Sequence, residues 1–416
     1  MSRKRAGAMA GALAIALLLT GCSKKAAPAS TGNDQLAIGQ GVTESTIKLG
    51  VLTDRTGPYA GLGKNIEQGR TLFWDKKNAD GGVCKRKVEF VVKDHGYNAQ
   101  HAVTAYAQVK DEVLALGELL GSPMIAGLTQ DLQTDNMLTM AVSWSSSLLS
   151  NPYVVVTGTT YDVEMINGIQ WLMQNKGLAK GDRIGHIFLE GDYGENAAAG
   201  SRAAAKEYGL QVVEQKIKPT DTDLTAQVTA LRNAGVRYVL LTGTPAQTAS
   251  AVGVAEASGF DATFLASNPA FSPALLSSPA KAALEKRLFI VTSVAPFTAE
   301  AAGPSEVRKA FLAKYPDQLK SQAVMYGHAT GQVMAAVLDT ACKNGALTRA
   351  GLLNAFQSLK SVQTDGLVAP LDYSKPGQIP AREVYVERPD AGVAGGVTQV
   401  QPLTAAPFAI SYEPTK

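Results

Sequence analysis

The chain has 416 residues, of which 45% are hydrophobic and 18% are charged, and its formal net charge is +3. This charge is small for the length, so a nucleic-acid partner is not expected. Without its N-terminal segment the chain keeps about 370 residues, more than one hydrophobic core usually supports, so we expect two lobes.

The N-terminal segment has the order of a secretory signal. Arg3, Lys4 and Arg5 precede an apolar run at residues 8–19, and Leu-Thr-Gly-Cys follows at 19–22. The apolar run is shorter than the ~20 residues that span a bilayer, and Leu-Thr-Gly-Cys resembles the bacterial lipobox. We therefore expect a lipoprotein signal peptide at residues 1–21 and a lipid anchor on Cys22. The alternative is an ordinary secreted protein with an incidental cysteine.

Residues 22–44 combine Cys22 with a stretch rich in Ser, Ala, Gly and Pro, which predicts a flexible tether. No second long apolar run follows, so only the anchor is expected to contact the bilayer. A domain tethered outside the cytoplasm meets an oxidising compartment, which makes Cys84 and Cys342 candidates for one disulfide. The two cysteines are too far apart in sequence for a metal knuckle.

The first predicted strand ends at a glycine-rich loop. Residues 47–52 form an apolar run with little alternation, as expected of a strand buried on both faces of a parallel sheet. The loop 54–63 carries Gly-Pro and Gly-Leu-Gly ahead of a helix expected from residue 64. Ligands bind beyond the carboxyl ends of such strands, so this loop is a site candidate. A tight turn without a ligand is the alternative, and neither GxGxxG nor a P-loop motif is present.

The body then alternates strand and helix patterns about once per thirty residues, which predicts an α/β fold with mostly parallel sheets flanked by helices. After residue 366, Pro370, Pro376, Pro380 and Pro389 alternate with short β-like pieces, which predicts a small appended β segment. The expected helices are 64–78, 99–110, 124–135, 162–176, 196–208, 223–234, 246–258, 305–315, 324–344 and 348–359, and the expected strands are 47–52, 88–92, 137–142, 183–189, 210–217, 236–241, 263–266, 287–291 and 383–387.

Catalytic motifs find no support in the sequence. His95, His101, His186 and His328 are scattered, and neither HExxH nor GxSxG occurs. We therefore expect no enzyme, no metal site and no cofactor.

Several motifs together resemble the type I periplasmic solute-binding proteins, in particular the branched-chain amino-acid and amide-binding group of ATP-driven importers. These motifs are TGPYAGLG, NADGG, SWSSS and GDYGEN, in that order along the chain. The resemblance implies a two-lobe clamshell with three interlobe crossovers and a ligand site in the cleft. By analogy, residues 45–157 and 292–364 form lobe one, and residues 158–291 and 365–416 form lobe two. Cys84 and Cys342 then both fall in lobe one, where we expect their disulfide.

Gly121-Ser122-Pro123 follows an apolar strand-like run and opens a helix. Ser122 is expected at the N-cap, with proline at the first helical position. The amides of Met124 and Ile125, the positive helix end and the Ser122 hydroxyl can together bind a carboxylate. The resemblance gives the corresponding serine this role, and a plain capping serine is the alternative.

The SWSSS turn closes the strand 137–142 and places hydroxyls at its carboxyl end. In the family this turn holds the α-carboxylate and ammonium of the ligand, which maps onto Ser145 and Ser147. Trp144 stands where the family has a small residue or proline, and we expect it to narrow the pocket.

The remaining binding candidates come from both lobes. Tyr193 in GDYGEN is expected to cover the ligand from lobe two, with a solvent-facing turn tyrosine as the alternative. Leu62 occupies the family's usual aromatic place, so Tyr59 is expected to supply the aromatic wall. Asn268 stands where amino-acid binders carry an acid that pairs with the ammonium, so an ammonium would need another partner, such as Asp192 or Glu190.

The resulting hypothesis is a monomeric, lipid-anchored solute receptor, facing outside the cytoplasm, that closes over a small amino acid, amide or related carboxylate and presents it to an ABC permease. An anchored ligand sensor with the same fold is the alternative. An α/β hydrolase is a third possibility, for which we find no nucleophile and base.

Overall fold

The computed structural model describes residues 36–414, and the lipobox and most of the predicted tether lie outside this range. A five-stranded, fully parallel sheet with the order β3-β2-β4-β5-β6 forms the centre of the first lobe. The strands β4 and β5 are buried along their whole length, which explains their mostly apolar sequences. The strands are β2 (Thr46–Thr53), β3 (Lys87–Asp94), β4 (Ala115–Leu120), β5 (Thr139–Val142) and β6 (Val154–Val156).

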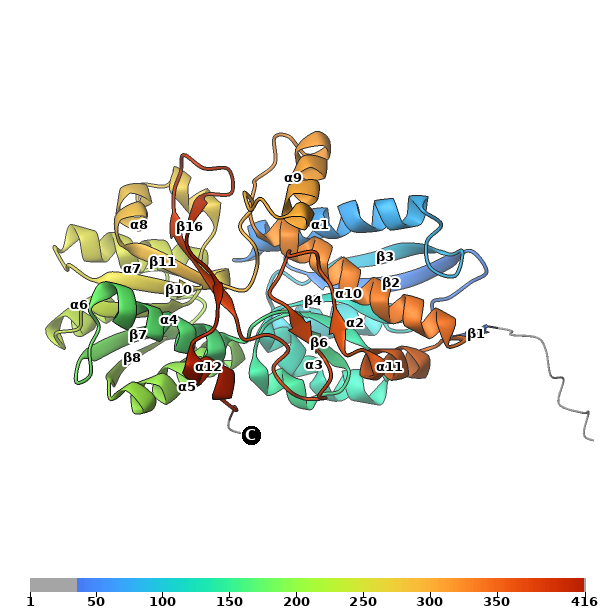
Figure 1. The fold of residues 1–416 in the computed structure, drawn as a ribbon, viewed down its shortest axis with the longest axis horizontal. Helices are drawn as coiled ribbons and strands as arrows, with labels where there is room; N and C mark the ends of the chain where they lie inside the picture. Colours follow the sequence, from blue (N-terminus) through green and yellow to red (C-terminus); the bar gives the residue numbers. More distant parts are fainter. Residues whose placement is uncertain (1–35, 415–416) are drawn as a thin grey trace, which may run out of the picture. The chain divides into compact units, whose positions relative to one another are not determined.

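The second lobe contains a seven-stranded sheet with the order β16-β15-β11-β10-β9-β7-β8. Its first five strands in the sequence are parallel, and β15 and β16 join antiparallel at the edge of β11. Strands β15 and β16 of the predicted C-terminal β segment are therefore part of the main sheet, and their description as an appended piece was wrong (Figure 1). The strands are β7 (Arg183–Leu189), β8 (Gln211–Ile217), β9 (Tyr238–Thr242), β10 (Thr263–Ser267), β11 (Leu288–Thr292), β15 (Val384–Pro389) and β16 (Val397–Thr404).

Helices cover both faces of each sheet, as the right-handed crossovers of parallel strands require. In the first lobe α1 packs along α10 on one face, whereas α2 packs with α3 on the other (Figure 1). The first-lobe helices are α1 (Ala60–Ala79), α2 (Ala99–Val109), α3 (Ser122–Thr134), α9 (Ala302–Lys314), α10 (Ala323–Lys343) and α11 (Arg349–Ser358). The second-lobe helices are α4 (Tyr161–Lys176), α5 (Asp192–Tyr208), α6 (Thr225–Asn233), α7 (Pro245–Ala257), α8 (Lys281–Arg287) and α12 (Pro407–Ser411).

Helices α1 and α5 each begin four residues earlier than the sequence predicted. Helix α1 starts at Ala60 and includes Gly61 and Gly63, so these glycines do not lie in an open loop. A Cβ on Gly63 would lie 2.3 Å from the carbonyl oxygen of Asp54, so only glycine allows this first turn to approach the end of β2. Helix α5 starts at Asp192, which places GDYGEN in a helical first turn.

The chain passes between the two sheets three times, after β6, after β11 and before β15. The crossing segments pair with one another through the bridges Val294–Val368 and Thr159–Ala381. The short strand β14 (Leu371–Asp372) still pairs with β13 (Ser361–Val362) beside α10. We therefore propose that the last lobe boundary lies after β14, a few residues beyond the expected boundary at 364.

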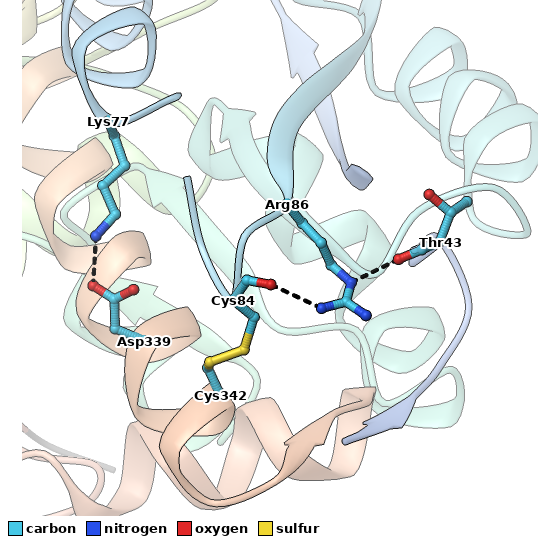
Figure 2. The surroundings of a disulfide bond; sticks show 6 residues. All are labelled: Thr43, Lys77, Cys84, Arg86, Asp339 and Cys342. Atoms are coloured by element: carbon cyan, nitrogen blue, oxygen red, sulfur yellow. Dashed lines mark hydrogen bonds and ion pairs between the residues drawn. A yellow bond between two sulfur atoms is a disulfide. The ribbon is translucent and has the colours of Figure 1, made fainter. Parts of the chain in front are cut away.

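One disulfide joins Cys84 to Cys342 across 258 residues, with the two Cα atoms 6.0 Å apart. Figure 2 shows that it links the turn after α1 to the last turn of α10. The ion pair between Lys77 Nζ and Asp339 Oδ2, at 2.8 Å, joins the same two helices. Both connections lie within the first lobe. Among the described residues, no helix is long and apolar enough to cross a membrane.

Candidate functional site

The candidate site lies between the carboxyl ends of the two sheets. The loop after β2 and the turn after β5 contribute from the first lobe, and the segments after β9 and β10 contribute from the second. Loops at the carboxyl ends of parallel strands are the usual ligand-binding positions of such sheets. The two lobes contact each other here, because the hydroxyl of Tyr59 donates to the carbonyl of Gly243 at 3.3 Å.

The larger of two cavities in this cleft, which we call the outer cavity, has a volume of about 300 Å³. This value is at the lower end of the range for small-molecule pockets. None of the described residues that line the cavity is charged. They are Pro58, Tyr59, Gly61, Leu62, Asn65, Pro245, Ala246, Asn268, Pro269, Phe271, Ser272, Pro273, Ala274, Leu275, Leu319, Ser321, Gln322, Ala323, Gly395 and Val397.

The second cavity, which we call the inner pocket, measures only about 20 Å³. Aromatic rings fill most of the space: Tyr59 lies 4.6 Å from Tyr97, and Tyr161 lies 4.5 Å from Tyr193, between ring centroids. The two cavities share Tyr59, Leu62 and Pro269. The inner pocket is lined by Tyr59, Leu62, Tyr97, Leu120, Gly121, Ser122, Val142, Trp144, Tyr161, Tyr193 and Pro269.

Ser122 lies at the inner pocket, but not as the predicted helix cap. Gly121 is the N-cap of α3, and the amides of Met124 and Ile125 both donate to its carbonyl at 3.1 Å. These two amides are therefore not free for a carboxylate, and this part of the prediction was wrong. The Ser122 hydroxyl shares a 2.6 Å hydrogen bond with the hydroxyl of Ser143.

The hydroxyls of Ser145 and Ser147 line neither cavity. They lie 2.9 Å apart, and the Ser147 hydroxyl donates to a carboxylate oxygen of Asp192, the first residue of α5. Burial raises the pKa of Asp192, while hydrogen bonds from the two serines oppose this shift. The structure thus places a carboxylate of the opposite lobe where the sequence predicted the ligand's carboxylate.

The aromatic and aliphatic side chains that the sequence predicted for the site do meet in the cleft. Tyr59 and Leu62 line both cavities, and Trp144 and Tyr193 line the inner pocket. The Tyr193 hydroxyl bonds to the hydroxyl of Ser267 at the end of β10. Burial raises the pKa values of Tyr59 and Tyr193 well above the ordinary tyrosine value, so both keep their protons.

Asn268 lines the outer cavity and is bonded across the cleft. Gln322 Nε2, just before α10, donates to Asn268 Oδ1 at 2.7 Å. Sequence reasoning missed Gln322, because it lies outside any motif and reaches Asn268 only when the lobes meet. It also missed Tyr97 and Tyr161, which both line the inner pocket.

This arrangement of two α/β lobes around an interlobe cavity defines a solute-binding clamshell. A model of the periplasmic binding protein family matches residues 46–394, and the chain belongs to this family. A Leu/Ile/Val-binding protein homolog of Brucella melitensis is 24% identical over 47% of this chain and 54% of its own length. A leucine-, isoleucine-, valine-, threonine- and alanine-binding protein of Pseudomonas aeruginosa is 24% identical over 53% of this chain and 60% of its own length. The chain thus spans little more than half the length of these relatives.

Solved structures extend the comparison to nearly the whole chain. A fatty acid ABC transporter substrate-binding protein from Thermomonospora curvata is 42% identical, with a TM-score of 0.89 over 92% of this chain and 98% of its own. A branched-chain amino acid ABC transporter protein from Thermus thermophilus with bound valine is 17% identical, with a TM-score of 0.76 over 90% of this chain and 99% of its own. The second likeness shows the fold alone. These relatives are named as binding or transport proteins, not as enzymes.

Proposed function

We propose that this protein is the extracytoplasmic substrate-binding component of an ABC importer and that it closes its lobes over an aliphatic carboxylic acid. The observation that carries the proposal is the outer cavity, which lies between the lobes and has a mostly apolar, uncharged lining. Leu62, Phe271 and Leu275 offer apolar surface to a hydrocarbon chain, whose burial supplies the main binding free energy. The likeness to the fatty acid ABC transporter substrate-binding protein from Thermomonospora curvata supports the same ligand class.

A branched-chain amino acid fits this cleft less well. Its ammonium group needs an acid or several acceptors when it is buried, since an unpaired buried charge costs several kcal/mol. No acid is among the described residues that line either cavity, and Asn268 presents an uncharged amide. The inner pocket, at about 20 Å³, also leaves no room for an amino-acid head group.

The polar wall of the outer cavity suits a carboxyl group without an ammonium. Asn268 and Gln322 form an amide pair from opposite lobes, and Ser321 lies beside them, with its hydroxyl 2.7 Å from Asn65 Oδ1. The Asn268 oxygen accepts from Gln322, and the Asn268 Nδ2 has no hydrogen-bond partner among residues 36–414, so it can donate to a ligand oxygen. Because Asn268 and Gln322 come from opposite lobes and both line the outer cavity, a ligand bound there can contact both lobes and thereby stabilise the closed arrangement.

A ligand panel read by thermal shift tests the proposal. It contains fatty acids of increasing length, leucine, isoleucine and valine, their des-amino keto acids, and short amides. A ligand at a hundred times its dissociation constant adds about 2.7 kcal/mol to stability, which gives a clear melting shift. We expect shifts with the aliphatic acids and none with the amino acids. Shifts with leucine and its relatives but not with the fatty acids would refute the proposal.

The variant Asn268→Leu tests the head-group contact. It keeps the size of the side chain but loses the donor, and a hydrogen bond to a charged group is worth about 1.5–3 kcal/mol, so fatty-acid affinity should fall at least about tenfold. Asn151→Leu is the matched control, because Asn151 is also buried but lines neither cavity. Equal affinities of both variants would exclude Asn268 as the head-group donor.

We further propose that a lipid on Cys22 anchors the protein beside its permease. The support is the lipobox order of the sequence, with the predicted tether separating the anchor from the fold. Cys22→Ser should move the protein from the membrane pellet to the soluble fraction while ligand binding stays unchanged. A variant that remains in the pellet would contradict the anchor.

A further inference from the structure

Trp144 closes the inner end of the cleft. The residue follows β5, and its side chain is only 2% exposed. Its ring lies 4.7 Å from the Tyr326 ring and 6.0 Å from the Tyr161 ring, and its indole N–H donates to the carbonyl of Thr157 at 2.9 Å. A fixed indole at this place accounts for the small volume of the inner pocket.

The backbone of the first crossing segment is shaped to receive this indole. Gly158 has a φ of +132°, and a Cβ built on it would lie 2.8 Å from the indole nitrogen of Trp144 and 2.6 Å from the hydroxyl of Ser293. Only glycine adopts this conformation readily and leaves the space free. Gly158 thus helps to determine the position of Trp144, because its lack of a side chain leaves the space that the indole fills.

Asp192 is hydrogen-bonded to serine hydroxyls of the turn that also contains Trp144. One of its carboxylate oxygens accepts from Ser147, and the other, Oδ2, is buried without a hydrogen-bond partner in the part of the chain that the structure describes. A ligand carboxylate at Ser145 and Ser147 would compete with Asp192 for these hydroxyls and would lie next to a second acidic group. Two carboxyl groups that share one site disfavour each other's charged form.

We propose that Trp144 and Asp192 together determine specificity, by keeping amino acids out of the inner end of the cleft and confining the ligand to the outer cavity. Trp144 removes the space for a head group, and Asp192 takes the hydroxyls that would bind its carboxylate. This inference rests on the proposed function, since it explains why the site prefers an aliphatic acid. It goes beyond the proposed function because it attributes the exclusion of amino acids to two residues at the inner end of the cleft.

The test compares Trp144→Leu, alone and combined with Asp192→Asn, with the wild-type protein. Leucine keeps the site apolar while it opens space. Trp74→Leu, alone and combined with Asp192→Asn, is the matched control, because Trp74 is also 2% exposed in the first lobe but lines neither cavity. Isothermal titration with leucine, valine and a series of fatty acids gives the affinities, and circular dichroism melting shows that each variant is folded.

We expect the double variant Trp144→Leu with Asp192→Asn to bind leucine at least about tenfold more tightly than the wild type, since like-charge juxtaposition and lost space both oppose binding there. It should also bind leucine more tightly than its Trp74 control, because that control lacks the Asp192 charge but keeps the Trp144 indole. Trp144→Leu alone should shift the fatty-acid preference toward longer chains. Tight leucine binding by the wild-type protein would overturn the inference, and so would folded Trp144 variants whose ligand profiles equal those of the Trp74 controls. Failure of the wild type to bind any fatty acid would instead refute the proposed function.

Discussion

Removal of the disulfide should destabilise the protein without changing its ligand preference. The double variant Cys84→Ser/Cys342→Ser opens a loop of 258 residues. In the chain-entropy model a loop of this size contributes about 5.6 kcal/mol, whereas removal of native disulfides typically costs about 2–5 kcal/mol. We expect a loss in the range of about 2–5 kcal/mol. The reason is that α1 and α10 remain packed, and Lys77 still pairs with Asp339, when the disulfide is absent.

The measurement is calorimetric melting of the variant and of the wild type with and without a reducing agent. At roughly 1.3 °C per kcal/mol for a fold of about 370 residues, a loss of about 2–5 kcal/mol lowers the melting temperature by roughly 3–6 °C. Fatty-acid affinities should stay the same, since the bond lies within the first lobe and lines neither cavity. Equal melting temperatures, or two free thiols at Cys84 and Cys342 in the denatured wild-type protein, would refute the reasoning.

Three further substitutions test the cleft and the cores. Tyr59→Phe removes the hydroxyl that donates to Gly243 across the lobes, and a net loss of about 0.5–1.5 kcal/mol should weaken ligand binding roughly two- to tenfold; unchanged affinity would mean that the bond does not help closure. Burial raises the pKa of Glu387 from 4.5 to about 8. Between these two pH values the folded state keeps a proton that the unfolded state loses, so Glu387 lowers the stability of the fold as the pH rises from 4.5 to about 8. Glu387→Gln should therefore gain stability relative to the wild type between about pH 5 and 8 in urea melts, by at most about 1.36 kcal/mol for each pH unit crossed, and parallel pH profiles would contradict the assignment. Arg70→Met leaves the buried Glu118 carboxylate without its partner and should lower the free energy of unfolding by about 3–5 kcal/mol. The double variant with Glu118→Leu should regain most of this stability, and equal melting temperatures of the single and double variants would count against the ion pair.

The sequence predicts the alternation of strands and helices well, because buried parallel strands such as residues 47–52 read as continuous apolar runs. It predicts helix starts less well. Ala60 and Asp192 begin their helices within Gly-rich, polar stretches that resemble loops, and only tertiary contact, such as that of Gly63 with Asp54, shows why the helix continues there. Strand β16 escaped prediction because its outer face is polar and mostly exposed.

The residues of the candidate site also divide into those that the sequence could predict and those that only tertiary contacts bring together. Tyr59, Trp144 and Tyr193 reach the cleft because they follow strand ends, which is a rule that a sequence can reveal. Gln322 is 54 residues from Asn268 and precedes a helix without any motif, so only the closed arrangement of the lobes brings the two amides together. The bond between Ser147 and Asp192 also depends on the meeting of the two lobes.

The three crossings between the lobes also constrain how the chain acquires its fold. The first sheet is complete at β6, but its covering helix α10 comes after the whole parallel part of the second sheet has been made. The second sheet in turn leaves β11 as an open edge until β15 arrives near the end of the chain. Neither core can therefore be sealed during synthesis, and an open parallel edge is a template for wrong pairing. Folding must await nearly the complete polypeptide, and a chain that stops before β15 should aggregate through β11 rather than yield a usable first lobe alone.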